Sequence, residues 1–486
     1  MNRLKSAVLQ RVPKSRFVRS VSILAGGTAA GQLIVIAASP ILTRLYSPED
    51  FGMLAVYGGV LGILGVIASL RYQLAIPLPD TDREALHIVA LSLLIVGLMT
   101  GIVWLAVVLA GQEFVALLNT PELAEYLWLL PVGLFLVGVF QVLQYWAIRV
   151  RAFSTIARTS VSQSVGMVLV QVGGYAIGPV MLLVGRVVGQ SAGIVSLSQL
   201  LRGNQAGKLT AVSAAQMKDV GSRYRNFPMV STWTGLANSA GANLPPVLIA
   251  VFLGGAAAGL FALAHRVLSQ PMAVIGQAIS DAFYQQAVEA NRNGQLYREV
   301  QRLYSTLIPL ALPLALTNFL VVPELFVLIF GDAWAQAGEV ARWMTPWLFF
   351  QFVVSPCTGI YPIIDRHDIA LRFQLSLLAS SVLGIVIGGI VFGSLVWVVG
   401  VISVLNSGIY LWRLVTTVNV VGGRILDPIY CLLKAVPVSL LVNAPLVTLI
   451  LYSDGESALW ALMSSVFMVL ALWFFLCGKK ALKGFS

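Results

Sequence analysis

Charged residues are scarce in this sequence. Only 10% of its 486 residues are Asp, Glu, Lys or Arg, whereas 58% are hydrophobic and the mean hydropathy is +0.87. Soluble globular domains carry about 25% charged residues, so this composition excludes that class. Apolar stretches of about 20 residues, long enough to cross a bilayer as a helix, recur from Val21 to Leu476. The sequence therefore predicts an all-α, polytopic integral membrane protein.

Several chemical signatures are also absent. Cys357, Cys431 and Cys477 have no paired spacing that would indicate a metal site or a disulfide, so we expect them to be packing residues. The sequence has no Walker A lysine motif and no segment large enough for an ATPase domain. Its outer loops are too small for the paired acids of a membrane glycosyltransferase. We therefore expect no catalytic residue, no metal and no cofactor.

Hydropathy predicts about 14 transmembrane helices, and the first six of them make one half of the chain. The polar segment Arg202 to Arg225 separates this half from the rest. The expected spans are 20–43, 51–70, 87–110, 123–148, 158–178, 180–201, 227–253, 257–284, 301–322, 340–363, 370–392, 395–415, 430–452 and 457–477.

The positive charges predict the orientation of these helices. Of the 31 Lys and Arg, all but Arg44, Arg186, Arg266 and Arg342 fall on the side of the N-terminus, which places both termini in the cytoplasm. This distribution explains the net charge of +11 without a nucleic-acid partner. The first apolar run, "VSILAGGTAAGQLIVIAASPILT", is too long for the core of a signal peptide, so we expect it to be retained.

Polar side chains form stripes on several spans, which is typical of transporters. One face of the first helix carries Gln32, one face of the fifth carries Gln171, and the seventh carries two neighbouring rows that include Asn238 and Asn243. On the eighth helix the members of one face are Arg266, Gln270, Gln277 and Asp281. The alternative is that each Ser, Thr, Asn or Gln only joins packed helices by hydrogen bonds.

Two arginines favour the transport reading more strongly. Arg186 and Arg266 lie well inside their spans, where an unpaired charge costs on the order of 2.5–3.5 kcal/mol. Asp281 is about four turns from Arg266 on the same helix and cannot pair with it. Arg186 shares its face with Gln190, one turn away. We therefore expect both arginines to face a lumen, although a structural ion pair stays possible for Arg266.

Arg44 is a different case, because it falls within one turn of a helix C-terminus. The helix dipole and the nearby interface both favour a cation there, so an anchoring role is preferred to ligand binding. The following "SPED", residues 47–50, predicts a tight turn in which Pro48 opens the next helix and Glu49 and Asp50 complement its positive end. A faint internal repeat superposes "LYSPEDFGMLAVYG" on "FLGGAAAGLFALAH", with Gly52 on Gly259.

Four segments in order resemble a known family. They are "LTRLYSPEDFGMLAVY", "SLRYQLAIPLPDTDREA", "YRNFPMVSTWTGLANSAGANLPPVLIAVFLGGAAAGLFALAHRVLSQPMAVIGQAISDAFYQQA" and "PELFVLIFGDAWAQAGEVARWMTPWLFFQFVVSPCTGI". Together they resemble the polysaccharide (O-antigen type) flippases of the multidrug/oligosaccharidyl-lipid/polysaccharide exporter superfamily. The likeness covers most of the chain, except the final 60 or so residues.

This resemblance implies a fold and a cargo. The fold has two six-helix lobes, 1–201 and 227–415, around a central cavity, with a cytoplasmic linker at 202–226 and two peripheral helices and a basic tail in 416–486. The implied cargo is a polyprenyl-pyrophosphate-linked oligosaccharide. It would move by alternating access from the cytoplasmic to the outer leaflet of a bacterial inner membrane, for O-antigen, capsule or exopolysaccharide synthesis. A polysaccharide polymerase and chain-length proteins are the implied partners, besides membrane lipid.

The residues that match the family pattern are Arg44, Pro48, Glu49, Phe51 and Gly52 in the first bend and Arg266 and Pro271 in the eighth helix. Gln73 in "RYQLAI" differs, because close relatives are expected to have Glu there. That difference removes a candidate proton or ion ligand. A cavity lined by arginines and amides suits a pyrophosphate and sugar hydroxyls. The expected substrate-binding residues are therefore Arg266, Arg186, Arg44, Asn238, Asn243, Gln270, Gln32 and Gln171.

Two alternatives remain open at this stage. A cation-coupled multidrug antiporter would need buried acids, and Asp281 is the candidate ion-coupling residue for it. A non-transporting scaffold of a polysaccharide export complex would instead tolerate substitutions in the cavity.

Overall fold

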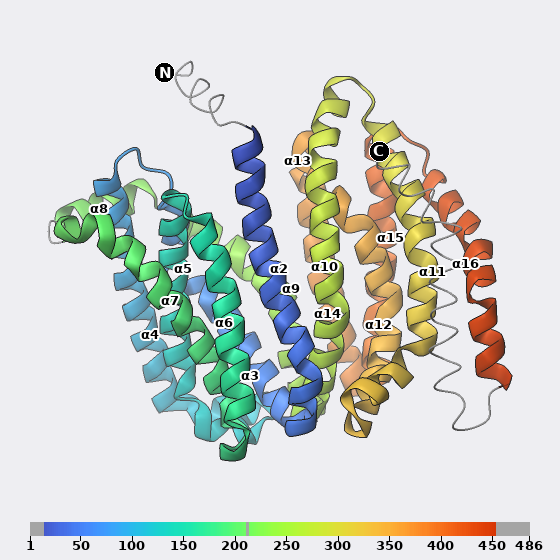
Figure 1. Ribbon diagram of the computed structural model, residues 1–486, viewed down its shortest axis with the longest axis horizontal. Helices are drawn as coiled ribbons and strands as arrows, with labels where there is room; N and C mark the ends of the chain where they lie inside the picture. Colours follow the sequence, from blue (N-terminus) through green and yellow to red (C-terminus); the bar gives the residue numbers. More distant parts are fainter. Residues whose placement is uncertain (1–13, 210–212, 453–486) are drawn as a thin grey trace. The chain divides into compact units, whose positions relative to one another are not determined.

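The computed structural model describes residues 14–209 and 213–452. Within these ranges the chain forms helices joined by short turns and has no β-strand (Figure 1). A helix occupies every expected span except the last, 457–477, which lies with the basic tail outside the described residues. The predicted all-α polytopic class is confirmed.

Eleven of the described helices are long and apolar enough to cross a membrane. The helices at the fifth and tenth expected spans, α6 (Phe153–Gly173) and α12 (Ala335–Val354), are not among these eleven. Their sequences explain the difference, because α6 begins with the polar run "FSTIARTSVSQS" and α12 contains Glu339 and Arg342.

Contacts between helices divide the chain into two units, which meet in the sequence between Gly259 and Leu260. The expected lobe boundaries at 201 and 227 stay a prediction. Besides α6, the long helices of the first unit are α2 (Lys14–Leu45), α3 (Pro48–Ile67), α4 (Asp82–Leu118), α5 (Leu129–Arg149), α7 (Val180–Leu209) and α9 (Thr232–Leu253). Short helices are η1 (Tyr72–Ala75), η2 (Pro121–Tyr126), η3 (Tyr175–Ile177), α8 (Ala214–Arg223) and the π-turn η4 (Phe227–Ser231).

In the first unit, α6 packs between α2 and α7, α5 packs between α4 and α7, and α9 packs against α3. One apolar core of this unit forms where α4, α5 and α7 meet, around Leu86, Val142, Trp146 and Leu197. The outer side of α4 is different, because Leu94, Leu98, Ile102, Leu105 and Leu109 are all more than half exposed. Such a continuous apolar stripe on the most hydrophobic span is the surface that a bilayer covers.

The second unit contains most of α10 (Gly255–Arg292), together with α11 (Leu296–Phe330), α12, η5 (Asp332–Trp334), η6 (Ser355–Gly359), α13 (Ile360–Ile363), α14 (His367–Phe392), α15 (Leu395–Val420) and α16 (Asp427–Tyr452). Helix α12 packs between α11 and α15, while α14 covers α15 and α16 covers α11. Buried side chains such as Tyr304, Leu307, Val353 and Leu414 form its core. Cys357 and Cys431 are free thiols, and Cys357 is fully buried, as expected of a packing residue.

The tight turn predicted at "SPED" is confirmed. Ser47 caps α3, because its hydroxyl accepts from the N–H of Asp50 at 3.2 Å and its own N–H donates to the Asp50 carboxylate at 2.9 Å. Pro48 is the first residue of the helix. Arg44 lies exposed in the last turn of α2, where the anchoring role requires it.

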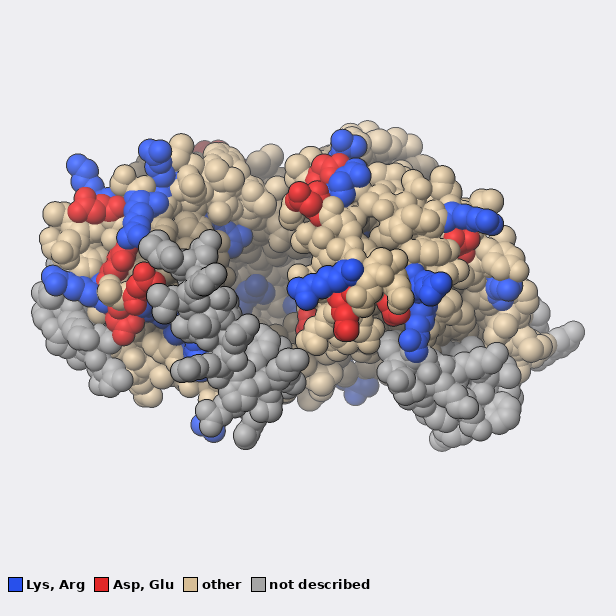
Figure 2. All heavy atoms as spheres, turned by 90° about the horizontal axis from the view of Figure 1, so that it is seen from above, with Lys and Arg blue, Asp and Glu red and all other residues tan. Residues whose placement is uncertain are grey.

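Ion pairs hold together the end of the first unit that carries α8. Arg149 pairs with Asp82 at 3.0 Å and also donates to the carbonyls of Ile76 and Pro79, while Arg223 pairs with Glu84 at 2.6 Å. Figure 2, which looks at the molecule from above, shows basic and acidic side chains together on that face. Charges of both signs mark helix ends that meet water rather than hydrocarbon.

Candidate functional site

A row of glycines on α3 brings polar side chains of two other helices close to its backbone. A Cβ placed on Gly58 would lie 3.0 Å from Nη1 of Arg186 on α7, and one placed on Gly62 would lie 2.6 Å from Oδ1 of Asn243 on α9. Because neither glycine has a side chain, the guanidinium and the amide occupy space that any other residue would fill. The structure thus brings two of the predicted site residues, Arg186 and Asn243, to one face of α3.

Arg186 is half-buried and its charge is not neutralised by the protein. Its Nε is buried without a hydrogen-bond partner, and no carboxylate in the part of the chain that the structure describes pairs with it. The neighbouring Tyr57 hydroxyl donates to the carbonyl of Leu129 at 3.0 Å. A guanidinium left unpaired inside a membrane span is costly, so it is suited to bind an anion.

Gln190 places a hydrogen-bond acceptor near the guanidinium donor of Arg186. It lies one turn from Arg186 on α7, and its buried Oε1 has no hydrogen-bond partner among the described residues. A ligand that carries both acidic oxygens and hydroxyl groups would satisfy both atoms.

Asn243 is held in place through Ser239, one turn earlier on α9. The amide nitrogen of Asn243 donates to the carbonyl and the hydroxyl of Ser239 at 3.0 and 3.2 Å. The Ser239 hydroxyl in turn donates to the carbonyl of Gly62 at 2.9 Å. With its donor side fixed in this way, the Oδ1 of Asn243 points at α3.

Arg71 is a second half-buried cation of this unit, and it contacts α9. Its place in the sequence had indicated only a loop charge. Its guanidinium lies over Gly235, and its buried Nε has no hydrogen-bond partner in the described residues. Leu70 and Arg71 both have positive φ angles, 47° and 62°, so the chain turns sharply where α3 ends. Gly59, which follows the Gly58 that Arg186 contacts, meets Asn243 and Val247 of α9, eight and twelve residues after Gly235. The two arginines therefore lie at levels separated by roughly 12–18 Å.

Next to Arg71 lies a buried network without charge. Gln73 is 1% exposed, accepts a hydrogen bond from the Ser69 hydroxyl, and donates to Oε1 of Gln141 at 3.1 Å. This is the position at which the family pattern led us to expect Glu. Two neutral amides and a hydroxyl form these hydrogen bonds with one another, so the network includes no titratable group.

The other predicted residues of the first unit do not join this cluster through any hydrogen bond that the structure describes. Gln171 is buried between α6 and α7, where its side chain donates to the carbonyl of Leu182 at 2.9 Å and its own carbonyl accepts from Tyr46 at 2.6 Å. Asn238 and Arg44 are exposed, and Gln32 is half-buried. Several hydroxyls on the same helices, Thr28 and Ser39 of α2 and Thr234 of α9, bond to carbonyls of their own helices.

The second unit holds the remaining predicted residues. Arg266 and Gln270 lie half-buried on α10, and Arg266 is already engaged in an interaction within the protein. Asp281, the ion-coupling candidate, is exposed and accepts from Nε2 of Gln277 at 2.7 Å.

Arg413 is a buried cation that the sequence does not reveal, because it falls at the end of an expected span, where a loop charge is typical. It lies inside α15 and is 6% exposed. Its guanidinium carbon is 3.8 Å from the ring centre of Phe373 and 5.1 Å from that of Tyr361. No carboxylate of the described residues pairs with it.

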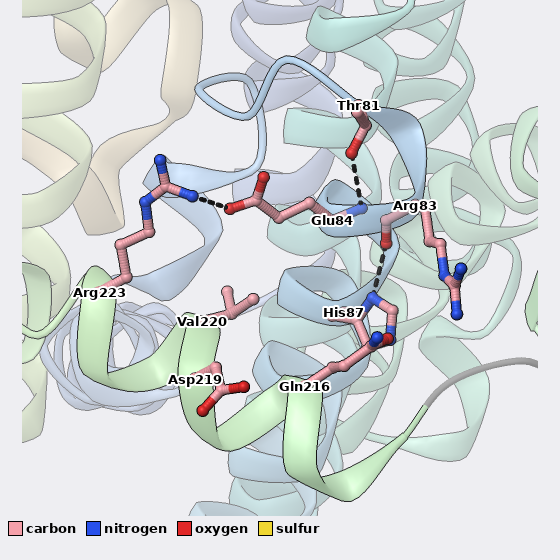
Figure 3. A pocket seen from close by; sticks show the side chains of 8 residues that line it. All are labelled: Thr81, Arg83, Glu84, His87, Gln216, Asp219, Val220 and Arg223. Atoms are coloured by element: carbon pink, nitrogen blue, oxygen red, sulfur yellow. Dashed lines mark hydrogen bonds and ion pairs between the residues drawn. The ribbon is translucent and has the colours of Figure 1, made fainter.

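A polar pocket of about 300 Å³ lies between α4 and α8 (Figure 3). Its lining residues are Thr81, Arg83, Glu84, His87, Gln216, Asp219, Val220 and Arg223. Nearby, burial raises the pKa of the Tyr72 phenol, which stays protonated and donates to the carbonyl of Gly221 at 3.0 Å. The ion pair between Arg223 and Glu84 lies in the pocket and balances its charge, so the pocket is a weaker anion site than the cluster around Arg186.

Comparison with known proteins gives one family. The model of the polysaccharide biosynthesis protein family matches residues 41–339. The succinoglycan biosynthesis transport protein ExoT of Rhizobium meliloti (strain 1021) is 26% identical over 376 residues, which cover 74% of this chain and 71% of that protein.

Solved structures share the fold at low sequence identity. The lipid II flippase MurJ in an inward closed conformation has a TM-score of 0.70 at 11% identity, covering 93% of this chain and 97% of its own. An inward-facing multidrug resistance MATE family transporter of the MOP superfamily has a TM-score of 0.61 at 14% identity, covering 80% and 95%. The resemblance drawn from the four sequence segments is confirmed. The chain belongs to the polysaccharide biosynthesis protein family and is a multi-pass membrane protein that shares its fold with these transporters.

Proposed function

We propose that this protein moves a polyprenyl-pyrophosphate-linked oligosaccharide from the cytoplasmic to the outer leaflet of a bacterial inner membrane by alternating access, with both termini in the cytoplasm. The observation that carries the proposal is the unpaired guanidinium of Arg186, which faces the glycine row of α3 beside Asn243. A pyrophosphate supplies the negative charge that this cation lacks. The amide and hydroxyl groups around it suit the hydroxyls of the first sugars.

Arg71 and Arg186 together suggest a route for the anionic head group through the first unit. Both have a buried Nε without a partner, and they lie at different levels of the contact between α3 and α9. An anionic head group that leaves one guanidinium meets the other. In a cell that is negative inside, the membrane potential itself favours outward movement of an anion by about 2.3 kcal/mol per charge per 100 mV.

In the second unit, Arg266 and Gln270 stay our proposed substrate-binding residues. The polymerase and chain-length proteins of the polymer pathway are the proposed partners. The antiporter alternative has no comparable support. Its ion-coupling candidate, Asp281, is exposed and already accepts a hydrogen bond from Gln277.

The test measures lipid-linked oligosaccharide on each face of the inner membrane in a deletion strain complemented with single variants. With Arg186→Ala, we expect build-up on the cytoplasmic face and loss of surface polysaccharide at normal protein levels, and Arg186→Lys should restore part of the flow. Arg302→Ala, at an exposed arginine of α11, serves as the control and should behave as wild type.

Three other outcomes would count against the proposal. Normal polymer with Arg186→Ala would remove this residue from the mechanism. Absence of any build-up in the deletion strain, together with altered accumulation of a lipophilic cation dye, would favour the antiporter. Sensitivity confined to changes on the surface loops would favour a scaffold.

A further inference from the structure

The first unit contains a second cavity of different chemistry. A half-open cavity of about 380 Å³ lies among α3, α4, α5 and α9, and the residues that line it are all apolar or glycine. Val60 and Leu64 form the α3 side, Val107 and Phe114 the α4 side, and Val247 the α9 side. It is separate from the polar pocket beneath α8, with which it shares no lining residue.

The shape of α4 opens this space. Ala110 leaves helical geometry, with φ −135° and ψ 22°, so the helix bends at the cavity wall. Ala106, Ala110 and Gly111 line the cavity on both sides of the bend, and their small side chains leave it unfilled. The kink at Ala110 and the small residues around it therefore keep the same volume open.

The chemistry of the cavity selects a hydrocarbon occupant. Water needs polar partners, and an apolar cavity of about 150 Å³ already stays dry and accepts benzene, so a space more than twice as large is suited to several isoprene or methylene units. The opposite face of α4, with Leu98, Leu105 and Val108, is exposed as a lipid-facing surface. Ala106 and Ala110 of the cavity lining are themselves exposed, so the cavity is accessible from outside the helices, where hydrocarbon chains are the solvent.

The cavity is also next to the polar cluster. Val247, which lines it, is one turn from Asn243 on α9, and Gly59 of α3 meets both residues. A Cβ placed on Gly59 would lie 2.6 Å from Cγ2 of Val247 and 2.8 Å from the carbonyl oxygen of Asn243. The two helices are in close contact here, so a ligand that uses both sites must pass round this contact; such a ligand would be amphipathic, with an anionic head near Arg186 and a hydrocarbon part in the cavity.

We propose that this cavity binds a segment of the polyprenyl chain of the cargo while the pyrophosphate is at Arg186. This assignment rests on the proposed function, because an apolar cavity alone does not distinguish a polyprenyl chain from the hydrocarbon chains of bulk phospholipid. The chain then serves as part of the recognised substrate rather than remaining in the lipid. Shape and contact must supply the selectivity, since moving a chain from lipid into an apolar pocket removes no surface from water.

The experiment measures binding of two pyrophosphates to the purified full-length protein in nanodiscs: undecaprenyl pyrophosphate, with a long chain, and dimethylallyl pyrophosphate, with a single isoprene unit. Ala106→Phe fills the cavity from α4 and Val60→Phe fills it from α3. Val108→Phe adds the same ring to the lipid-facing side of α4, where Val108 is 61% exposed, and is the control. Each variant is first checked for an unchanged elution profile and thermal midpoint.

We expect both cavity-filling variants to weaken binding of the long-chain compound about tenfold, because a ring in the cavity excludes most of the chain's contacts, and to leave the short-chain compound unaffected. The control should bind both as wild type does. Arg186→Ala should weaken both compounds equally, since they share the pyrophosphate.

The outcomes separate the two proposals. Unchanged long-chain binding in Ala106→Phe and Val60→Phe would overturn the cavity assignment while leaving the pyrophosphate site intact. Absence of any specific pyrophosphate binding to the wild type would instead overturn the proposed function. In a second measurement, a photoactivatable phosphatidylglycerol that labels Phe114 and is not displaced by undecaprenyl pyrophosphate would assign the cavity to bulk lipid and overturn the proposal.

Discussion

Gly52 and Gly259 lie against each other where the first turns of α3 and α10 cross. A Cβ on Gly52 would collide with the carbonyl oxygen of Gly255, and a Cβ on Gly259 would collide with that of Pro48. The alignment of "LYSPEDFGMLAVYG" with "FLGGAAAGLFALAH" pairs Pro48 with Gly255 and Gly52 with Gly259. The contact of Gly52 with Gly255 thus has the contact of Gly259 with Pro48 as its counterpart. The faint internal repeat therefore corresponds to a symmetric contact between two helix beginnings.

This reciprocity makes the two glycines equivalent in their effect on stability. Gly52→Ala and Gly259→Ala should each destabilise the protein by about 1–3 kcal/mol, because a methyl group would have to displace backbone rather than a flexible side chain. The measurement is the thermal midpoint in detergent. Gly97→Ala and Gly101→Ala are matched controls on α4, where no atom lies within 4 Å, and they should be neutral or slightly stabilising. Equal midpoints in all four variants would show that the crossing is loose.

How far the sequence predicted the molecule depends on the kind of signal involved. Hydropathy located the helices, and the Ser47–Asp50 capping pattern predicted the turn, because both depend on residues that are neighbours in the chain. Arg186 was found because a charge inside a span is conspicuous. The glycine row of α3 was not found from the sequence, because a glycine in an apolar helix does not reveal which helix will approach it. The partners of that row, on α7 and α9, are set by tertiary packing.

Arg71 and Arg413 were missed for a related reason. Both lie near the ends of expected spans, where a cation normally snorkels to water. Their burial follows from neighbours distant in the sequence, Gly235 for Arg71 and Phe373 for Arg413. Conversely, polar residues on the spans led us to expect more contact with a lumen than hydrogen bonding requires. Several of the hydroxyls already donate to carbonyls of their own helix.

Arg71 should contribute to pyrophosphate binding independently of Arg186. We expect Arg71→Ala and Arg186→Ala each to weaken binding of dimethylallyl pyrophosphate, and the double variant to show the sum of the two free-energy changes within about 0.5 kcal/mol, since the side chains are on different levels. Arg71→Lys should restore part of the loss. Isothermal calorimetry on the four proteins measures the cycle. A double variant no weaker than either single variant would mean that the two arginines hold one group together.

The neutral network around Gln73 gives an expected pH dependence. Gln73→Glu places a carboxyl group at a position that is 1% exposed, where burial raises its pKa above the unfolded value and favours the protonated form. The folded state then binds the extra proton more tightly than the unfolded state, so stability is lost as pH rises from the unfolded pKa of about 4.3 towards the raised one.

The measurement for this variant is the thermal midpoint between pH 5 and pH 8. Gln73→Glu should approach the wild type at the acidic end and fall below it at the alkaline end. Gln73→Leu removes the same hydrogen bonds without adding a titrating group, so its deficit should not vary with pH. A constant deficit for Gln73→Glu as well would show that its carboxylate finds water or a cation in the folded protein.

Substitutions at Arg413 test whether this cation contributes to stability or to transport. Its guanidinium stacks on Phe373 and faces Tyr361, and such a desolvated contact is worth up to about 2 kcal/mol. Burying the unpaired charge costs several kcal/mol, so the apolar Arg413→Met should be at least as stable as wild type. Arg413→Lys should be less stable, because an ammonium is more strongly hydrated and cannot stack as a plane. Arg302→Met, at an exposed arginine of the same unit, is the control for both.

If the thermal midpoints follow this order, the arginine is not explained by stability, and flipping assays on Arg413→Met become decisive. Loss of transport in a variant that folds as well as wild type would mean that the charge acts on the cargo or on a conformational step. A marked fall in the midpoint of Arg413→Met would instead show that the stack on Phe373 outweighs desolvation, and Arg413 would then be a structural cation of α15.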